Sequence, residues 1–389
     1  MLERCQSLMT VTTRPNRVMV RGQGSYLWDD HGRRYLDFIQ GWAVNALGHA
    51  APEIARALAQ QASLLISASP ALHNAPQIEL ADRLVALSGL HRVGFCNSGA
   101  EANEGAIKLA RKWGRLHRQG AYEIVTAEQA FHGRTLAAMA ASGKPGWDEL
   151  FPPNMPGFRR VPFGDLAAVR RHVGSKTAAI MVEPIQGEAG VIVPPDGYLR
   201  GLRQIADEFA VLLVFDEVQT GLGRTGRLFA FEHEGVRPDI LTLGKGLGGG
   251  VPLSAVLANE RADCFAPGDQ GGTYHGNPLM TAVGNAVVEC IAKPDFLASA
   301  RALGAILERG LRALVARHGG VARGRGLLWA VELPVARAET VRDACFENGL
   351  IINAARPHVL RLMPSLRVSP DEIASMLDTL DAAMRGTPP

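Results

Sequence analysis

The chain has 389 residues, of which 47% are apolar and 20% charged, as expected for a globular protein with a sizeable core. A net charge of +3 from interspersed residues argues against a nucleic-acid-binding surface, and no apolar run reaches the ~18 residues that span a bilayer. The first ten residues lack the apolar segment of a secretory signal. Scattered cysteines without a CxxC pair predict reduced thiols, a cytoplasmic protein and no metal site. They are Cys5, Cys96, Cys264, Cys290 and Cys345.

The predicted elements begin with a hairpin at residues 25–38 (SYLWDDHGRRYLDF). From about residue 90 to 260, short apolar runs alternate with helical patterns such as those at 100–116 and 197–210. Because these runs are continuous, they predict strands of a largely parallel sheet that is covered on both faces. The predicted strands are 92–95, 123–127, 178–184, 211–217, 240–244 and 253–259.

The C-terminal part has a different pattern. Helical stretches at 296–317 and 338–348 flank GLLWAVEL, and VLRLMPSLRVS leads into a last helix at 370–385. This pattern predicts a small α+β domain that the N-terminal segment joins. The expected division is an N-terminal segment (1–50), a large α/β domain (51–285) and a C-terminal small domain (286–389).

Ligands of open α/β sheets bind at the carboxyl ends of the strands, and distinctive motifs follow the predicted strands here. They are CNSGAEANE, FHGRT, EPIQGEAG, DEVQTGLGRTG and GKGLGGG. Two of them contain G-x-G-x-x-G, but neither joins a strand directly to a helix, so a dinucleotide site is disfavoured. A P-loop is excluded because no Ser or Thr follows Lys245.

Three of these motifs suggest one ligand. Ser98-Gly99-Ala100 at a helix start favours a phosphate, although an ordinary N-cap explains it equally well. Asp216 ends a buried strand, where a carboxylate needs either an arginine partner or a protonated heterocycle. Lys245 is an isolated amine among glycines. Pyridoxal phosphate has a phosphate, a pyridine nitrogen and an aldehyde that suit these groups in turn.

The chain also resembles the class III (ornithine-type) pyridoxal-phosphate aminotransferases over nearly its whole length. The segments that carry the resemblance are YLDFIQGWAVNALGHAAPEI, NSGAEANEGAIKLAR, EPIQGEAGV, FDEVQTGLGRTG, LGKGLGGG, GTYHGNPL and HVLRLMPSLRVS. The resemblance implies the fold-type I architecture of pyridoxal-phosphate transferases, similar to aspartate aminotransferase.

The resemblance implies a role in cofactor binding for nine positions. Lys245 would bind the aldehyde covalently and act as the base, and Asp216 would pair with the ring nitrogen. The phosphate would be held by Ser98, Gly99 and Ala100, with Thr273 contributed by the partner subunit of a homodimer. The ring would be contacted by Phe131, Val218 and Gln219.

Substrate binding is implied for four further positions. Arg361 would take the α-carboxylate of glutamate, and Glu188 would mask it when an amine donor occupies the site. Arg134 would hold the far carboxylate, and Trp42 would narrow the pocket. Gly272 and His275 depart from residues common in relatives, which leaves the amino donor open.

The segments AVNALGH, FHGRT and VLRLMP are most similar to class III members that act on acetylornithine. The implied reaction is transamination of N2-acetylornithine with 2-oxoglutarate, which gives N-acetylglutamate 5-semialdehyde and glutamate in arginine biosynthesis. The alternatives are ornithine, succinylornithine or 4-aminobutyrate as donor, and a glutamate-semialdehyde aminomutase on the same fold.

Overall fold

The structure is a computed structural model that describes residues 7–386. Its largest sheet has seven strands in the order β4-β10-β9-β8-β7-β5-β6. All strands run in one direction except β10, which is antiparallel to both neighbours. The strands are β4 (Arg92–Cys96), β5 (Glu123–Ala127), β6 (Phe158–Val161), β7 (Thr177–Val182), β8 (Leu212–Asp216), β9 (Ile240–Leu243) and β10 (Ser254–Ala258). The predicted, largely parallel sheet is therefore confirmed.

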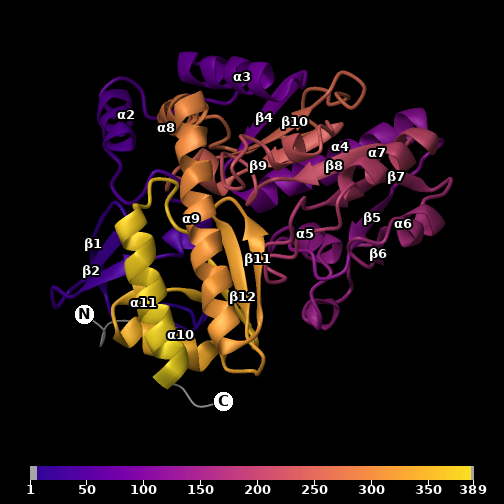
Figure 1. Ribbon diagram of the computed structural model, residues 1–389. Coiled ribbons are helices and arrows are strands. Elements are labelled where there is room, and N and C mark those ends of the chain that lie inside the picture. The colour runs from indigo at the N-terminus through magenta and orange to yellow at the C-terminus, as the bar shows by residue number, and fades with distance from the viewer. Residues whose placement is uncertain (1–6, 387–389) are drawn as a thin grey trace.

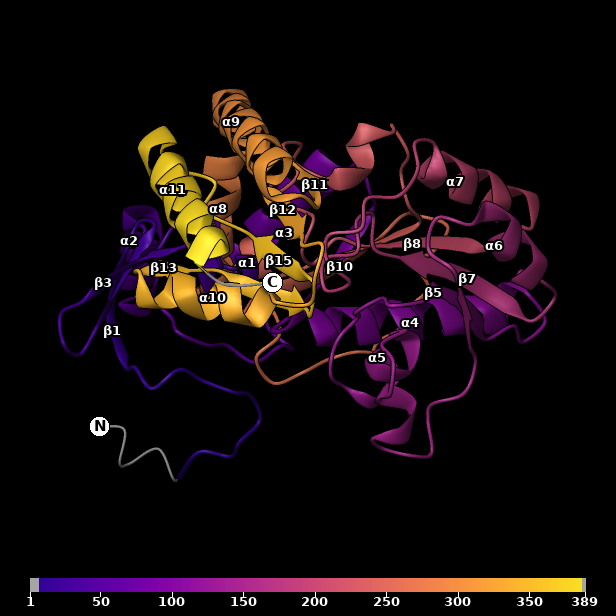
Figure 2. The ribbon, with the colours of Figure 1, turned by 60° about the horizontal axis from the view of Figure 1, so that its bottom comes forward.

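Helices cover both faces of this sheet. Figure 2 shows α4 (Gly99–His117) and α5 (Leu136–Ala141) on one face, and α6 (Leu166–His172) and α7 (Tyr198–Glu208) on the other. The central strands β5, β7 and β8 are buried at every position, which explains their continuous apolar sequences. The sequence did not predict β6, because two arginines interrupt its apolar pattern at the sheet edge.

The N-terminal strands lie with the C-terminal part of the chain. The antiparallel strands β1 (Met19–Gln23), β2 (Tyr26–Asp29) and β3 (Arg34–Asp37) form a sheet that β13 (Leu350–Ile351) joins in parallel to β3. The predicted hairpin at 25–38 is the β2–β3 pair.

A second antiparallel sheet has the order β11-β12-β15-β14. Its strands are β11 (Val321–Arg325), β12 (Leu328–Glu332), β14 (Asn353–Arg356) and β15 (Val359–Leu362). The long helix α9 (Pro294–His318) packs on β11 and β12, α10 (Ala338–Glu347) packs on β13 and β14, and α11 (Pro370–Gly386) packs on α9. Figure 1 shows this layer beside the seven-stranded sheet.

The remaining helices connect these layers. They are α1 (Gln40–Ala43), α2 (Pro52–Ala62), α3 (Ala75–Ser88), α8 (Pro278–Ile291) and the 3-10 turns η2 (Trp147–Glu149), η3 (Ala230–His233) and η4 (Lys245–Leu247). We keep the three-part division as a proposal, but residue 285 lies inside α8, so the α8–α9 turn is the better second boundary. Within residues 7–386, every helix is too short or too polar to span a bilayer.

Candidate active site

Close backbone contacts bring the ends of three elements together. A Cβ on Gly99 would lie 2.6 Å from Val218 Cγ1, and a Cβ on Gly244 would lie 3.2 Å from the same atom. A Cβ on Gly133 would lie 2.7 Å from that of Ala100. The start of α4, the residues after β8 and β9, and the FHGRT loop therefore meet at one place, as expected for the carboxyl ends of parallel strands.

The start of α4 is built as a capping box. Ser98 Oγ accepts a hydrogen bond from Glu101 N (3.3 Å), and the Glu101 carboxylate accepts one from Ser98 N (2.7 Å). The predicted N-cap is thus confirmed. The N–H groups of Gly99 and Ala100 lie in the first turn, where no helical carbonyl precedes them, so they can bind an anion.

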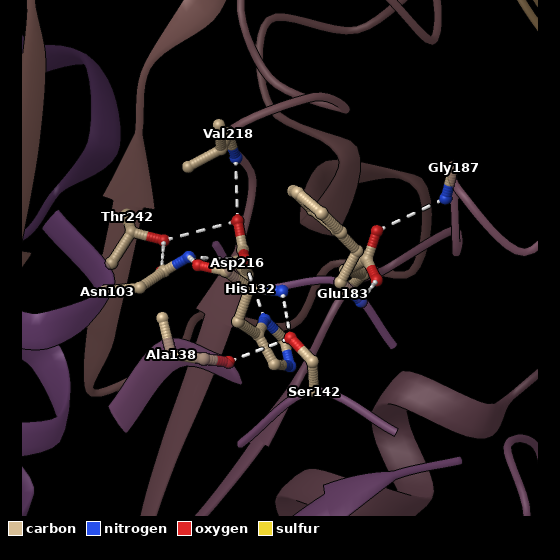
Figure 3. A network of polar contacts seen from close by, with 10 residues as sticks. Asn103, His132, Ala138, Ser142, Glu183, Gly187, Asp216, Val218 and Thr242 are labelled. Atoms are coloured by element: carbon tan, nitrogen blue, oxygen red, sulfur yellow. Dashed lines mark hydrogen bonds and ion pairs between the residues drawn. The ribbon is translucent and has the colours of Figure 1, made fainter. Parts of the chain in front are cut away.

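Asp216 lies at the end of β8, with 3% of its surface exposed, and has no arginine partner among residues 7–386. Its Oδ2 accepts hydrogen bonds from His132 Nδ1 and Asn103 Nδ2, both at 2.7 Å (Figure 3). Val218 N donates to Oδ1 at 3.0 Å. Thr242 Oγ1 lies 3.4 Å from Oδ1 but is closer to Asn103 Oδ1, at 2.8 Å. Oδ1 therefore keeps a lone pair for one more donor.

His132, Asn103 and Thr242 were not predicted from the sequence. Ser142 Oγ accepts a hydrogen bond from His132 N, and the His132 side chain is fully buried. Burial lowers the pKa of its imidazole, but the hydrogen bond to Asp216 and the charges of Asp216 and Glu183 outweigh this and raise it. The available signals were a histidine beside Phe131 and polar residues within the apolar patterns of α4 and β9.

Lys245 begins η4 in a left-handed conformation with a φ of 43°. Such a conformation is costly for a residue with a Cβ and is found at functional sites. Burial lowers the pKa of the Lys245 amine; Glu188 opposes this shift, and Arg361 adds to it. A lower pKa favours the neutral amine, which is the form that can attack an aldehyde or accept a proton.

The side chains at this place fit pyridoxal phosphate. The amide of Gln219 is buried, and neither its oxygen nor its nitrogen has a partner among residues 7–386. A buried polar group without a partner is costly, and a ligand hydroxyl would satisfy it. The Gln219 amide thus suits a ring hydroxyl. The first-turn N–H groups suit a phosphate, the remaining Asp216 lone pair suits a protonated ring nitrogen, and the Lys245 amine suits an aldehyde.

Arg361 is fully buried on β15 and pairs with Glu188. Its Nη2 donates to Glu188 Oε1 at 2.7 Å and its Nε donates to Asn353 Oδ1 at 3.1 Å, whereas Nη1 has no partner among the described residues. Burial raises the pKa of the Glu188 carboxyl, but the charges of Arg361 and Lys245 outweigh this and lower it. Glu188 is therefore ionised at neutral pH and occupies part of the Arg361 fork.

The Trp42 ring lies against the Arg361 guanidinium. The Arg361 Cζ is 5.5 Å from the centre of the Trp42 ring, which is half exposed. Trp42 belongs to α1, a single left-handed turn with φ between 50° and 66° at all four residues. Only one of these residues is glycine, so the turn carries strain of about 1–2 kcal/mol for each of the others. Asp37 Oδ1 accepts hydrogen bonds from the N–H groups of Ile39 and Gln40 and holds the turn.

Arg134 lies near Phe131, although its guanidinium does not pair with an acid among residues 7–386. Its Cζ is 4.8 Å from the Trp147 ring centre and 5.9 Å from that of Phe131. Lys144 Nζ is 5.1 Å from the same Trp147 ring. Two cations thus lie on one aromatic side chain beside the predicted stacking residue, and both stay available for substrate carboxylates.

Thr273 is the predicted residue that this chain alone does not place in the site. It is exposed, as is its neighbour Tyr274. His275 Nε2 lies 3.4 Å from Glu101 Oε1, so the loop approaches the start of α4 in its own chain. The His275 ring lies over Gly272, and a Cβ at that position would be 2.5 Å from His275 Nε2.

Known proteins resemble this chain over almost its whole length. The profile of the family described as aminotransferase class-III matches residues 9–384. Acetylornithine aminotransferase 2 of Bordetella bronchiseptica is 54% identical over 97% of this chain and 96% of its own length. Acetylornithine aminotransferase of Ralstonia nicotianae is 49% identical, over 98% and 97%.

Solved structures agree with these relatives. Ornithine aminotransferase from Toxoplasma gondii superposes with a TM-score of 0.94 at 34% identity, over 98% of this chain and 93% of its own. N-acetylornithine aminotransferase from Stenotrophomonas maltophilia has a TM-score of 0.84 at 36% identity, over 96% of each chain. With the site geometry above, these matches show that the chain belongs to the class III aminotransferases.

Proposed function

We propose that the protein transfers the δ-amino group of N2-acetylornithine to 2-oxoglutarate, giving N-acetylglutamate 5-semialdehyde and glutamate. As a class III aminotransferase it is a pyridoxal-phosphate enzyme that acts on amino and keto acids. Relatives at 45% to 54% identity that are named acetylornithine aminotransferase support this donor.

The observation that carries the proposal is the bond between Glu188 and the buried Arg361 (2.7 Å). A substrate with a terminal amine brings no carboxylate to Arg361, and an unpaired buried guanidinium is costly. Glu188 satisfies it during that half-reaction. Glutamate and 2-oxoglutarate have an α-carboxylate that takes the place of Glu188, while Arg134 binds their second carboxylate. One site can thus accept both substrate types.

The chemistry of the residues follows from their placement. Bound pyridoxal phosphate supplies an aldehyde for the amino group and a ring that withdraws electrons from the reacting carbon. Asp216, held by His132 and Asn103, keeps the ring nitrogen protonated. Lys245 would remove the proton from the substrate carbon that bears the amino group and return it to the carbon that carries the aldehyde in the cofactor.

A donor panel tests this function. With 2-oxoglutarate as acceptor and glutamate as readout, acetylornithine should give the highest kcat/KM among acetylornithine, ornithine, succinylornithine and 4-aminobutyrate. A different best donor would overturn the assignment. Conversion of glutamate semialdehyde without any external keto acid would instead identify an aminomutase.

We also propose a homodimer with shared sites, in which Thr273 serves the phosphate of the partner subunit. Exposed apolar side chains support an interface on this chain, since large apolar patches mark contact sites. They include Leu64 (79% exposed), Leu65, Ile66 and Leu72. Reduced thiols support a cytoplasmic location, because Cys96 and Cys345 are free and buried. Cys5 lies outside the described residues.

Mixed dimers test the shared site. Thr273→Asp should repel the phosphate, and Lys245→Ala should remove the reacting amine, so each homodimer should be nearly inactive. A heterodimer of the two would have one site with both lesions and one intact site, and should recover about half of the activity. Activity near zero would mean that Thr273 acts within its own chain.

A further inference from the structure

A second buried carboxylate, Glu183, lies near His132 and Asp216 and has no part in the chemistry above. It follows β7 and is 6% exposed. Burial raises the pKa of its carboxyl to about 7, against the charge of His132, which lowers it. Among residues 7–386 no Lys or Arg pairs with it. Burying a carboxyl without a cationic partner costs free energy, so its presence here needs a structural or functional reason.

Glu183 connects two segments of the site through backbone hydrogen bonds. Its Oε1 accepts from Phe131 N at 2.9 Å, and its Oε2 accepts from Gly187 N at 3.1 Å. Figure 3 shows the carboxylate directed at Gly187 beside the Asp216 network. One side chain thus fixes the backbone that carries the predicted ring-stacking residue and the turn that leads to Glu188.

Gly187 transmits any movement of this turn to two other groups. A Cβ at Gly187 would lie 1.6 Å from Gln219 Oε1, so the Gln219 amide lies directly against its backbone. The next residue, Glu188, is bonded to Arg361 at 2.7 Å. The position of the Glu188 carboxylate on Arg361 therefore depends on where Gly187 is held.

We infer that Glu183 is a positioning residue that sets how firmly Glu188 masks Arg361, and thereby the preference between amine donors and α-amino acids. This inference rests on the masking role in the proposed function. Above the pKa of about 7 the Glu183 carboxyl is ionised, and a bond from a backbone N–H to an ionised carboxylate is stronger than one to a neutral amide. Weakening the Gly187 bond lets the turn relax, Glu188 leaves Arg361 more often, and dicarboxylates gain access to it.

A double-mutant cycle that needs no turnover tests the inference. The probe is glutarate, a dicarboxylate without an amino or keto group, and its Kd is measured calorimetrically on the enzyme purified with pyridoxal phosphate. Glu183→Gln should tighten glutarate binding roughly tenfold, about the value of one charge-assisted hydrogen bond. In a Glu188→Ala background the same substitution should have no effect, because the effect acts through Glu188.

Glu217→Gln is the matched control. Glu217 is also buried, and its carboxylate accepts hydrogen bonds from Ala230 N (2.7 Å) and Phe231 N (2.8 Å), which belong to η3. It should leave the glutarate Kd unchanged. If Glu183→Gln does not fold, Glu183→Asp takes its place, since a side chain one methylene shorter cannot reach both N–H groups.

Each outcome decides the question. An unchanged Kd in the Glu183 variant, or an effect that persists without Glu188, overturns the inference. The same tightening in Glu217→Gln would mean a general loosening of the fold and also overturns it. If the wild-type enzyme does not accept acetylornithine but the glutarate Kd values change as expected, the proposed donor is refuted. Glu183 then remains the residue that positions Glu188.

Discussion

The interior end and the entrance of the active site differ in how their charges are satisfied. At the interior end, each of the carboxylates of Asp216, Glu183 and Glu217 accepts at least two hydrogen bonds from the chain itself. At the entrance, Arg134, Lys144 and Arg356 have no acidic partner among residues 7–386, and Arg356 Nε and Nη2 are buried without a hydrogen bond.

The pKa of Lys144 shows that these cations lie near one another. Burial lowers the pKa of its amine, and Glu188 opposes the shift. Three further cations lower it as well: Arg356, Arg134 and Arg361. A fully buried charge must be compensated by the fold, whereas Arg134 is exposed and Lys144 and Arg356 are partly exposed, so these cations remain available to bind a substrate anion. The interior end should therefore govern cofactor chemistry, stability and, through Glu183, the masking of Arg361 by Glu188. The entrance cations should govern the affinity for substrate anions.

The largest effect is expected at Lys245. Lys245→Ala removes both the cofactor-binding amine and the base, so kcat should fall by at least about four orders of magnitude, the upper range for a general base. The visible absorption of lysine-bound cofactor should disappear. The protein should stay folded, because alanine has the same Cβ as lysine and can keep the backbone conformation of this position (φ of 43°). Circular dichroism checks the fold, and turnover at the wild-type rate would refute the assignment.

The next largest effect is expected at Glu188, between the two ends. In Glu188→Ala, Arg361 stays open, so specificity should move from acetylornithine toward glutamate by roughly tenfold to a hundredfold. Single-turnover mixing follows the two half-reactions separately. Equal losses in both half-reactions would mean that Glu188 only supports the structure.

Smaller effects are expected from the entrance cations. Lys144→Gln or Arg356→Gln should raise the KM for 2-oxoglutarate roughly threefold to fivefold, the upper range for charge pairs that solvent still reaches, with kcat unchanged. The increase should shrink at high salt, because screening weakens exposed charges. Arg170→Gln, which removes an exposed cation from α6, is the control and should leave KM unchanged. Equal effects of all three substitutions would refute a local role.

Much of this site could be predicted from the sequence because its motifs are local. Ser98, Asp216 and Lys245 each lie at or just after the end of a predicted strand and within a few positions of a glycine. The partners of Asp216 could not be predicted in this way, since His132 is 84 positions away and Asn103 is 113 away. A polar residue on an apolar helix face signals a buried partner but does not identify it.

The strained backbone at residues 40–43 could not be predicted from sequence patterns either. The left-handed turn at 40–43 contains a single glycine, so local propensity argues against it, and tertiary contacts with Asp37 hold it. The edge strand β6 was missed because the arginines on it face out of the core, where they pair with Glu123 and Asp148. In both cases long-range contacts outweigh the local pattern.

The smallest effect on activity is expected for Glu217, whose carboxylate acts on the stability of the fold instead. Burial raises the pKa of the Glu217 carboxyl from 4.5 to about 7, so between these values the folded state holds a proton that the unfolded state has released. Raising the pH through this window removes the proton and lowers the stability of the fold, by up to about 3 kcal/mol for this group. Glu217→Gln cannot titrate, so the fall in its thermal midpoint between pH 5 and 8 should be smaller than in the wild type. The KM values of the variant should match those of the wild type. The Glu217 carboxylate accepts hydrogen bonds from backbone N–H groups of η3 and contacts none of the entrance cations. A variant with the wild-type pH slope would show that Glu217 titrates alike in the folded and unfolded states, and a changed KM would show that Glu217 also affects substrate binding.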